Sequence, residues 1–512
     1  MAITAFAAID IGSYNVSMEI FEVGRKNGLR SLTSVRMPLE LGKDTFALKK
    51  ISMKKLGELI RILTDYKRIM KEYGVSDLRA CAKSAFREAE NRDLIIDHIL
   101  RATGIRVDIL SNSEQRFLGY KSIASKGEEF QKFIEKGTAI VDIGGGSAQI
   151  SLFDKDALVS TQNLLLGSLR IRENLSRIDR ETLRYDALIE ELIRSELVSF
   201  RKMYLKNRRI ENIILVGDYF TNLIFQNRND LNKTETRDEF MEWYKSIAEG
   251  SPREVGEEMG ITSEVSTVLI PMAVLYRMLI NEFDVQTIWL PGIQLTDGIA
   301  YDYGERKKLI KSSHDFENDI LRAARNMSRR YASNKAHNES LVASSETIFN
   351  AVRKICGLVP RDRLLLKVAC YLHDCGKYIS MTDTAESSYN IIKSTEIIGL
   401  SDRERSIIAN VVRFNTRAIA AYNSAERPEG LNIGDYMLAL RLAAILRLAG
   451  SLDISYKQKT ESLKVSVKDR ELHINIGTKE DYTLERGFFD VNSEFFEEIF
   501  DLKPVLKVRT LI

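Results

Sequence analysis

The sequence contains few of the residues that define disulfide-rich or zinc-binding proteins. Among its 512 residues are only five histidines and four cysteines, the latter at positions 81, 356, 370 and 375. These cysteines have neither the spacing of a disulfide framework nor that of a zinc site, so we expect free thiols in a reducing cytoplasm. The formal net charge of +3 is close to neutral, so overall charge identifies no polyanionic partner.

Hydrophobic runs are short. The apolar run from Val268 to Tyr276 ends at Arg277, far short of the ~20 residues that cross a bilayer. The opening stretch MAITAFAAIDIG lacks a basic segment and reaches Asp10 too early for a signal peptide. We expect a cytoplasmic protein with no membrane and no DNA partner. At roughly 150 residues per domain, a chain of this length holds three or four domains.

Two stretches of the N-terminal half repeat each other. Residues 7–21 read AAIDIGSYNVSMEIF, and residues 139–153 read AIVDIGGGSAQISLF. Each has an apolar run, then Asp-Ile-Gly, a turn of small or polar residues and a second apolar run, so Asp10 corresponds to Asp142. The pattern predicts a β-hairpin in each stretch. Strand and helix patterns alternate between the stretches, and the repeat therefore predicts two similar α/β domains.

The two predicted turns have the composition of phosphate-binding loops. Glycine lets a phosphate approach the backbone amides, and a neighbouring carboxylate can hold Mg²⁺ through water. An ordinary tight turn would explain one such stretch, but the duplication favours phosphate binding. The residues that we expect around the phosphate are Asp10, Gly12, Ser13, Asn15, Gly144, Gly145, Gly146 and Ser147.

The sequence pattern changes after about residue 305. Leu341, Ile348 and Val352 recur at helical spacing, and a second apolar helix ends at the pair His373 and Asp374. Helical patterns continue to about residue 455. The tail, LKVSVKDRELHINIG, alternates apolar and polar residues around a turn, which predicts a small module that contains β-strands.

Four further motifs accompany the two turns. They are AKSAFREAENR (82–92), LSNSEQRFLGY (110–120), LLLGSLRIRE (164–173) and HDCGKYIS (373–380). Together with the turns, their order and spacing resemble the exopolyphosphatase and guanosine pentaphosphate phosphohydrolase (Ppx/GppA) family of the actin and sugar-kinase superfamily. The resemblance implies two actin-like (ribonuclease H-like) α/β lobes, an all-α HD-like domain and a small α+β C-terminal module. The expected boundaries are 1–125 and 126–305 for the lobes, 306–455 for the HD-like domain and 456–512 for the module.

The resemblance also implies a reaction and roles for single residues. Hydrolysis of a phosphoanhydride needs positioning, charge neutralisation and an oriented water. In the family register Arg87 neutralises phosphate oxygens, Glu114 is the general base toward the attacking water, and Asp142 with Glu114 holds Mg²⁺. Gly167 and Arg170 are in register with a further loop. A homodimer formed through the C-terminal halves is expected from the resemblance. Outside this register, Arg87 and Glu114 would be interpreted as solvated charges at helix ends.

Several residues depart from the family pattern. Gln149 replaces a carboxylate expected near the metal, Tyr14 replaces an asparagine in the first loop, and Ser113 replaces one of the paired glutamates beside Glu114. An amide brings no charge, so weaker Mg²⁺ affinity is expected. The segment GDYFTNL (217–223) is poor in glycine where superfamily relatives hold a nucleotide, so we do not expect ATP use.

The HD-like segment lacks part of the usual metal-ligand set. His337, His373 and Asp374 fit the first three ligand places, but Gly450 stands where the final aspartate is expected. Asp453 is a nearby replacement. We predict a catalytically silent domain in which His373 is a buried, hydrogen-bonded histidine. Nucleotide hydrolysis at this site would require a bound metal.

Three functions remain open on these grounds. The preferred one is an exopolyphosphatase, which releases terminal phosphate from inorganic polyphosphate with Mg²⁺. Dense basic residues between positions 306 and 335 favour this long polymer, although charged helix faces are often merely solvated. The second function is hydrolysis of the 5′-terminal phosphate of guanosine pentaphosphate (pppGpp). The third is a polyphosphate or alarmone sensor that has kept the loops and lost turnover.

Overall fold

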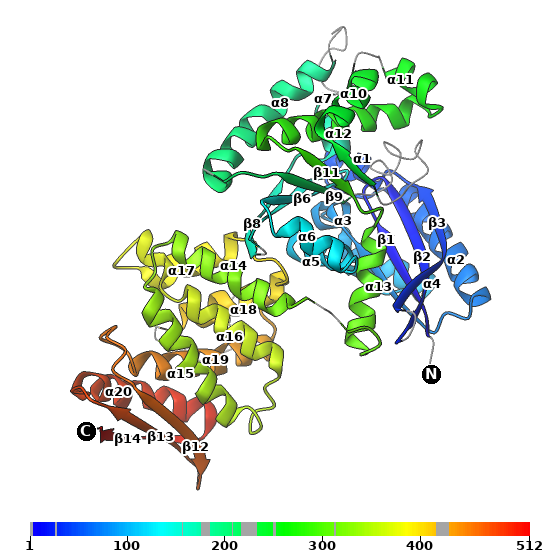
Figure 1. Ribbon diagram of the computed structural model, residues 1–512. Coiled ribbons are helices and arrows are strands. Elements are labelled where there is room, and N and C mark those ends of the chain that lie inside the picture. Colours follow the sequence, from blue (N-terminus) through cyan, green and yellow to red (C-terminus); the bar gives the residue numbers. More distant parts are fainter. Residues whose placement is uncertain are drawn as a thin grey trace. The chain divides into compact units, whose positions relative to one another are not determined.

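The protein forms two compact units, Met1–Asp315 and Phe316–Ile512, each of which is described by itself. The computed structural model describes residues 4–25, 28–155, 157–175, 185–206, 208–216, 233–248, 252–311, 314–415 and 430–511. The first unit contains two α/β lobes with one β-sheet each (Figure 1).

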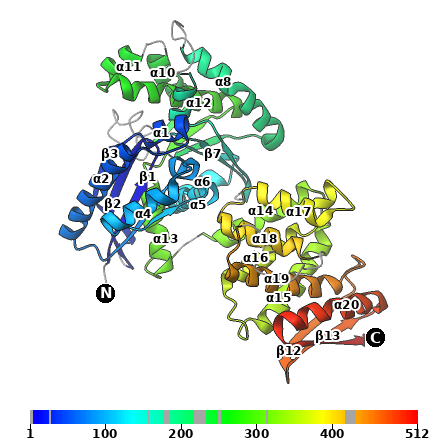
Figure 2. The same ribbon diagram turned by 180° about the vertical axis from the view of Figure 1, so that it is seen from behind.

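Lobe I surrounds a five-stranded sheet with strand order β3-β2-β1-β4-β5. Its elements are β1 (Thr4–Ile11), β2 (Asn15–Gly24), β3 (Gly28–Pro38), α1 (Leu41–Leu48), α2 (Met53–Glu72), β4 (Asp77–Ala82), α3 (Ser84–Glu88), α4 (Arg92–Thr103), β5 (Val107–Ile109), α5 (Asn112–Ala124) and α13 (Leu295–Arg306). Helices α2 and α4 pack on one face of the sheet, and α5 and α13 pack on the other (Figure 2). The sheet is therefore buried on both faces, which explains the nearly continuous apolar run of β1.

Lobe II surrounds a six-stranded sheet with strand order β10-β11-β9-β6-β7-β8. Its elements are α6 (Glu128–Ile134), β6 (Thr138–Ile143), β7 (Ala148–Asp154), β8 (Ala157–Leu164), α7 (Ser168–Leu175), α8 (Tyr185–Phe200), η1 (Arg201–Leu205), β9 (Asn212–Val216), β10 (Lys233–Thr236), α10 (Arg237–Ala248), α11 (Pro252–Met259), α12 (Ser263–Phe283) and β11 (Thr287–Leu290). The order β8-β7-β6-β9-β11 matches the whole sheet of lobe I, with parallel and antiparallel pairs at the same places. The predicted repeat is thus confirmed as a repeat of topology.

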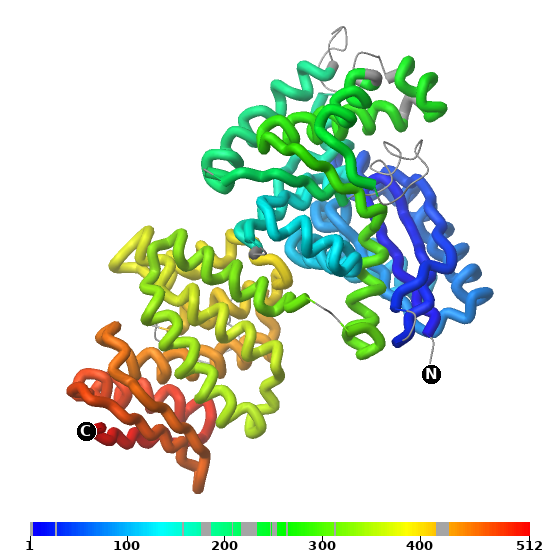
Figure 3. Tube along the Cα trace, in the orientation of Figure 1, coloured from blue at the N-terminus to red at the C-terminus, as the bar shows by residue number. Residues whose placement is uncertain are grey.

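Helix α13 returns from lobe II to lobe I. Its Ile299 packs in the same cluster as Phe6 of β1, and the Tyr303 and Phe6 rings stack with centroids 4.0 Å apart. Figure 3 traces the chain of α13 beside the first strands. The sequence predicts that residues 126–305 form lobe II. In the structure, residues 295–306 pack with lobe I instead, because the apolar face of α13 covers its sheet.

Helix α12 is long and mostly apolar. Its window Val265–Phe283 is long and apolar enough to cross a membrane, with a mean hydropathy of 1.3, yet 72% of it is buried inside the protein. Buried core helices of soluble proteins meet the same criterion, so the window is weak support for a membrane span.

The second unit combines helices with a three-stranded sheet of order β12-β13-β14. Its elements are α14 (Phe316–Arg330), α15 (Lys335–Val352), α16 (Pro360–Leu372), η2 (Cys375–Tyr378), α17 (Thr384–Ser394), α18 (Asp402–Arg413), α19 (Ile433–Ser451), β12 (Ser462–Lys468), β13 (Glu471–Thr478), α20 (Thr483–Phe500) and β14 (Lys503–Thr510). Apolar residues of β13 and α20 share one core cluster with those of α15, α16, α18 and α19. The C-terminal strands and helix are therefore packed onto the helices rather than separate from them.

Candidate active site

The two predicted phosphate loops connect β1 to β2 and β6 to β7. In lobe I the Gly12 N–H donates to the Asn15 carbonyl oxygen at 2.9 Å. In lobe II the Gly144 N–H donates to the Ser147 carbonyl oxygen, also at 2.9 Å. The repeat found in the sequence is therefore a repeat of backbone geometry as well.

Segments from the two lobes pack directly against each other at these loops. Within lobe I, Ser13 Oγ lies 2.8 Å from Ser84 Oγ, and both residues face the loop of lobe II. A Cβ on Gly146 would lie 2.5 Å from Ser84 Oγ, and a Cβ on Gly145 would lie 3.1 Å from Ser13 Cβ. A Cβ on Gly167 would lie 2.3 Å from the Gly146 carbonyl carbon. Close packing of protein on protein therefore requires small residues here, in addition to any approach of a ligand.

Arg170 fixes the lobe II loop from the side of α7. Its Nε donates to the Gly146 carbonyl oxygen at 2.7 Å, and its guanidinium pairs with Glu88 of α3. The same guanidinium lies over the Phe46 ring, 4.3 Å from the centroid. The sequence motif predicts that Arg170 belongs to a family loop. In the structure its side chain connects the two lobes, because it contacts Gly146 of lobe II and Glu88 and Phe46 of lobe I.

Asp10, at the end of β1, is buried and paired with a lysine that the sequence analysis did not single out. Lys83 Nζ lies 3.0 Å from Asp10 Oδ2, and the side chains are 12% and 8% exposed, respectively. Cys81 is the register partner of Asp10 on β4. Burial raises the pKa of the Cys81 thiol to about 12, so this thiol is neutral at neutral pH. The sequence feature that could have identified Lys83 is its position directly after the strand β4, beside the first loop.

Arg87, Gln115 and Asp142 form a chain of contacts across the lobes. Arg87 Nη1 donates to the Leu110 carbonyl oxygen at 2.8 Å and to Gln115 Oε1 at 3.3 Å. Gln115 Nε2 donates to Asp142 Oδ2 at 3.4 Å. The structure thus brings the predicted Arg87 and Asp142 together, and the residue between them is Gln115.

Glu114 lies one residue before Gln115 and makes different contacts. Its Oε2 accepts hydrogen bonds from the Ser111 N–H at 2.9 Å and the Ser111 Oγ at 2.8 Å, which forms a capping box at the start of α5. Glu114 also lines a pocket of about 760 Å³ together with Arg79 and Asp108, and none of the phosphate-loop residues lines that pocket. Its role as general base stays a prediction.

The family motif can be placed on this segment in two registers. When the pattern Ser-Gly-x-Glu-Glu-Ala-Arg begins at Ser111, its two glutamate places fall on Glu114 and Gln115. When it begins one residue earlier, they fall on Ser113 and Glu114, and its arginine falls on Arg116. Either register leaves a single carboxylate in the pair, at Glu114.

The donors of this site fit Mg²⁺, the ion implied by the family resemblance. Asp10 Oδ1 and Gln149 Oε1 are buried and have no hydrogen-bond partner among the described residues. Gln149 lies opposite Asp142 on the neighbouring strand, so the two side chains share a face of the sheet. The described residues contain no group of three or more His, Cys, Asp or Glu that could hold a metal by themselves. Mg²⁺ commonly takes one or two carboxylates and completes its shell with water and substrate phosphate, so this sparse donor set suits it.

Of the two other departures, Tyr14 lies within the described residues. Tyr14 is 7% exposed and belongs to the buried hydrophobic cluster of lobe II, so its ring packs in a protein core. The segment GDYFTNL at 217–223 lies outside the described residues.

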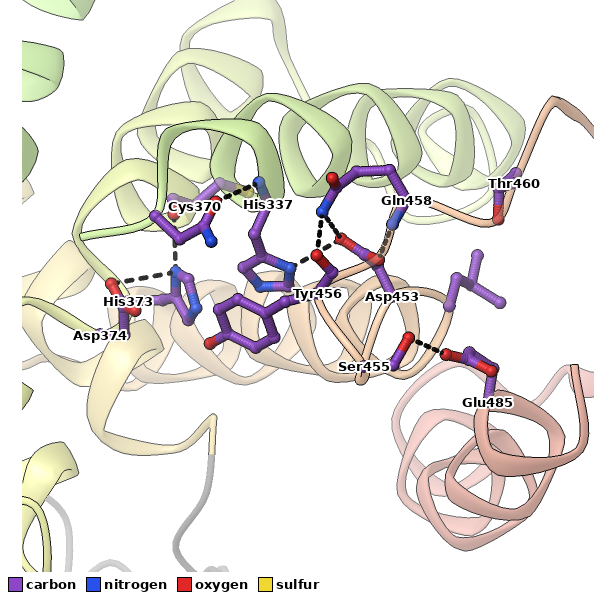
Figure 4. Close-up of polar contacts among 12 residues, drawn as sticks. His337, Cys370, His373, Asp374, Asp453, Ser455, Tyr456, Gln458, Thr460 and Glu485 are labelled. Carbon is purple, nitrogen blue, oxygen red and sulfur yellow. Dashed lines mark hydrogen bonds and ion pairs between the residues drawn. The ribbon is translucent and has the colours of Figure 1, made fainter. Parts of the chain in front are cut away.

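The HD-like residues of the second unit form a hydrogen-bonded cluster (Figure 4). His337 Nδ1 lies 2.8 Å from Asp453 Oδ2, and Asp453 also accepts from the Gln458 N–H at 2.7 Å. His373 Nδ1 lies 2.9 Å from the Cys370 carbonyl oxygen. Asp453, rather than position 450, is therefore the acid that reaches His337.

A second set of contacts covers this cluster. The Tyr456 ring stacks on His337 with centroids 3.7 Å apart. Lys377 Nζ donates to Tyr456 Oη at 2.9 Å and lies 3.4 Å from Asp374 Oδ2. Burial lowers the pKa of His373 to about 4, so its imidazole is neutral at neutral pH. The described residues here form no group of three or more His, Cys, Asp or Glu that could hold a metal.

Comparison with known proteins assigns the chain to a family. Residues 20–307 match the Ppx/GppA phosphatase family, and residues 321–492 match domain III of the Ppx/GppA phosphatases. The chain belongs to the Ppx/GppA phosphatase family. Guanosine-5'-triphosphate,3'-diphosphate pyrophosphatase of Photobacterium profundum is 19% identical over 449 residues, which are 86% of each chain. Exopolyphosphatase 2 of Mycobacterium tuberculosis is 26% identical over 206 residues, or 38% of this chain and 63% of that one.

Other matches are partial. The bifunctional 3-dehydroquinate synthase/phosphatase of Fusobacterium nucleatum is 26% identical over 173 residues, which are 33% of this chain and only 26% of that protein. The crystal structure of an exopolyphosphatase from Cytophaga hutchinsonii covers 60% of this chain and 99% of that one, with a TM-score of 0.53 and 16% identity. This likeness supports the actin-like α/β fold of a Ppx/GppA protein.

Proposed function

We propose that this Ppx/GppA protein is an exopolyphosphatase, which releases the terminal phosphate of inorganic polyphosphate by Mg²⁺-dependent hydrolysis. The observation that carries the proposal is the pair of matching loops at Gly12 and Gly144, with Arg87 and Asp142 brought together across the lobes. Backbone N–H groups of two such loops can bind a chain of phosphates, and Arg87 can neutralise their oxygens.

Asp142, Asp10 and Gln149 would hold Mg²⁺ in this proposal. The ion would neutralise charge on the phosphate oxygens. The protein groups position the terminal phosphate, and Arg87 together with the loop amides stabilises the charge that develops on it. Glu114 can act as the predicted base only if its carboxylate gives up its hydrogen bonds to Ser111.

A second candidate is hydrolysis of pppGpp. The observation in its favour is the relative from Photobacterium profundum, a guanosine-5'-triphosphate,3'-diphosphate pyrophosphatase that matches 86% of both chains. The third interpretation, a sensor with little turnover, draws support from Gln115 and Gln149, two uncharged amides beside Asp142.

Three further features belong to the proposal. The second unit would be a catalytically silent HD-like domain, because its described residues bring together no group of three or more His, Cys, Asp or Glu that could hold a metal. We also propose a homodimer and a cytoplasmic location, which follow from the family resemblance and from the sequence.

The test is phosphate release from four compounds, each with Mg²⁺ or with EDTA. Long-chain polyphosphate and pppGpp are the candidate substrates, ATP tests the expectation of no ATP use, and p-nitrophenyl phosphate detects unspecific monoesterase activity. Fastest release from polyphosphate, abolished by EDTA, is the expected result. Preference for pppGpp would promote the second candidate. Binding of polyphosphate without release would support the sensor, and neither binding nor release would overturn the proposal.

A further inference from the structure

We infer that Gln115, and not Glu114, faces the terminal phosphate, where its side-chain amide orients the attacking water. This inference rests on the proposed hydrolysis and names the residue that limits its rate. Gln115 is 6% exposed and lies in the first turn of α5, directly at the junction of the two lobes.

The position of Gln115 follows from its two contacts. Its Oε1 accepts from Arg87 of lobe I at 3.3 Å, and its Nε2 donates to Asp142 of lobe II at 3.4 Å. Arg87 is the proposed phosphate ligand, and Asp142 is the proposed metal ligand. A group between these two lies where the terminal phosphate and the attacking water have to meet. Both contacts are longer than the usual 2.9–3.0 Å of N–H···O bonds, so they can be exchanged for contacts with a ligand at small cost.

Glu114 cannot share this position. Successive residues of a helix point about 100° apart, so Glu114 and Gln115 face different surroundings. The Glu114 carboxylate accepts two hydrogen bonds from Ser111 and borders the pocket that contains Arg79. Turning it toward Asp142 would break the capping box and place two carboxylates together.

The chemistry of an amide differs from that of a carboxylate at this place. The water oxygen bonds to the terminal phosphorus, the bridging P–O bond breaks, and its electron pair leaves with the shortened chain. A glutamine side chain can accept a hydrogen bond from the water but cannot take its proton, which therefore passes to a non-bridging oxygen of the released phosphate. Water-orienting glutamines are used in this way in phosphoryl transfer. A glutamate at position 115 would add a general base, a contribution that is commonly about 10²–10⁴-fold.

The experiment compares wild type with Glu114→Gln, which removes the carboxylate of this pair, Gln115→Glu, which adds a second one, and the double variant, which moves the single carboxylate by one residue. Phosphate release from polyphosphate and from pppGpp is measured with Mg²⁺ between pH 5 and pH 9, and binding of both compounds is measured separately. We expect Gln115→Glu to raise kcat at least tenfold and to add a limb in which the rate rises with pH. The double variant should resemble Gln115→Glu, and Glu114→Gln should lose no more than about threefold.

The outcomes separate this inference from the proposed function. Loss of activity in Glu114→Gln, with no gain in Gln115→Glu, would make Glu114 the base and overturn the inference. If the proteins bind polyphosphate or pppGpp but Gln115→Glu does not raise kcat, the inference about Gln115 is also overturned. The proposed ligand would then still stand. Failure of all four proteins to bind either compound would overturn the proposed function itself.

Discussion

The two hairpin loops share a backbone but differ in how their aspartates are used. Gly12 and Gly144 make the same turn hydrogen bond at 2.9 Å. In lobe I, however, Asp10 is neutralised by Lys83, whereas in lobe II Asp142 contacts the uncharged Gln115. The two aspartates therefore differ in a neighbouring group: a buried lysine lies beside Asp10, and an uncharged amide lies beside Asp142.

The strands that follow the loops also differ. Ser17 lies opposite Asp10 on β2, while Gln149 lies opposite Asp142 on β7. Two residues further along β2, Glu19 is buried and accepts hydrogen bonds from Ser31 and Thr296. The repeat therefore preserves the backbone of the turn, while the side chains around the two turns differ.

The strongest test of this division replaces each aspartate by asparagine. Asp142→Asn should lower phosphate release at least ~100-fold, about 3 kcal/mol of transition-state stabilisation, with little change in Tm. Asp10→Asn leaves the mostly buried Lys83 without its partner and should lower the unfolding free energy by about 2 kcal/mol. Kinetics and thermal unfolding of both variants provide the measurement. If Asp142→Asn and Asp10→Asn lowered turnover equally and lowered stability equally, the two aspartates would have the same role.

Glycine substitutions separate packing from ligand approach. Gly167→Ala places a Cβ 2.3 Å from the Gly146 carbonyl carbon and should cost about 2–3 kcal/mol of stability, because backbone must shift. Gly144→Ala meets only the Ser147 carbonyl oxygen at 3.8 Å, an ordinary contact, so the fold should tolerate it. A loss of polyphosphate affinity in Gly144→Ala with unchanged Tm would locate the ligand beside Gly144. Unchanged affinity would move the ligand away from it.

Lys83 provides the next comparison. Lys83→Met keeps the chain length and removes the cation, so the Asp10 carboxylate becomes free to attract Mg²⁺. The Mg²⁺ concentration for half-maximal activity should fall about fivefold, equivalent to ~1 kcal/mol, while KM for polyphosphate rises. Lys49→Met is the matched control, because Lys49 pairs with Glu88 at 3.7 Å and its side chain is 55% exposed. If both variants behave alike, Lys83 has no special relation to the metal.

Part of this arrangement could be predicted from the sequence. The shared Asp-Ile-Gly pattern predicted both hairpins, and the same pattern predicted the matching lobes. The sequence predicts that Glu114 faces the phosphate loops, whereas Gln115 is the residue of this pair that contacts Asp142. Which of the two faces the loops depends on the rotation of α5 about its own axis. A helix-capping pattern, Ser111 followed three residues later by Glu114, was present in the sequence and indicates that rotation. The return of α13 to lobe I and the pairing of Lys83 with Asp10 are tertiary contacts, which no local pattern encodes.

The smallest expected effect concerns Glu19, whose counterpart in lobe II is Ser151. Burial, together with the charge of Glu19, raises the pKa of Asp297 to about 7. The folded protein therefore holds a proton on Asp297 up to about pH 7, whereas the unfolded chain releases it near the ordinary value of 3.8. Because the folded state binds more protons in this window, the unfolding free energy falls as pH rises from about 4 to 7.

Asp297→Asn removes this dependence and keeps a side-chain oxygen for the Gln294 N–H, which Asp297 Oδ2 accepts at 2.7 Å. The variant should be about 1 kcal/mol more stable than wild type at pH 8 and equal to it near pH 4. Urea unfolding across this range measures the difference. Asp93→Asn, at a carboxylate that is 94% exposed, should show no such trend. If the difference in unfolding free energy between Asp297→Asn and wild type were the same at all pH values, Asp297 would be ionised in the folded protein. The pair of Glu19 and Asp297 would then not distinguish the two hairpins.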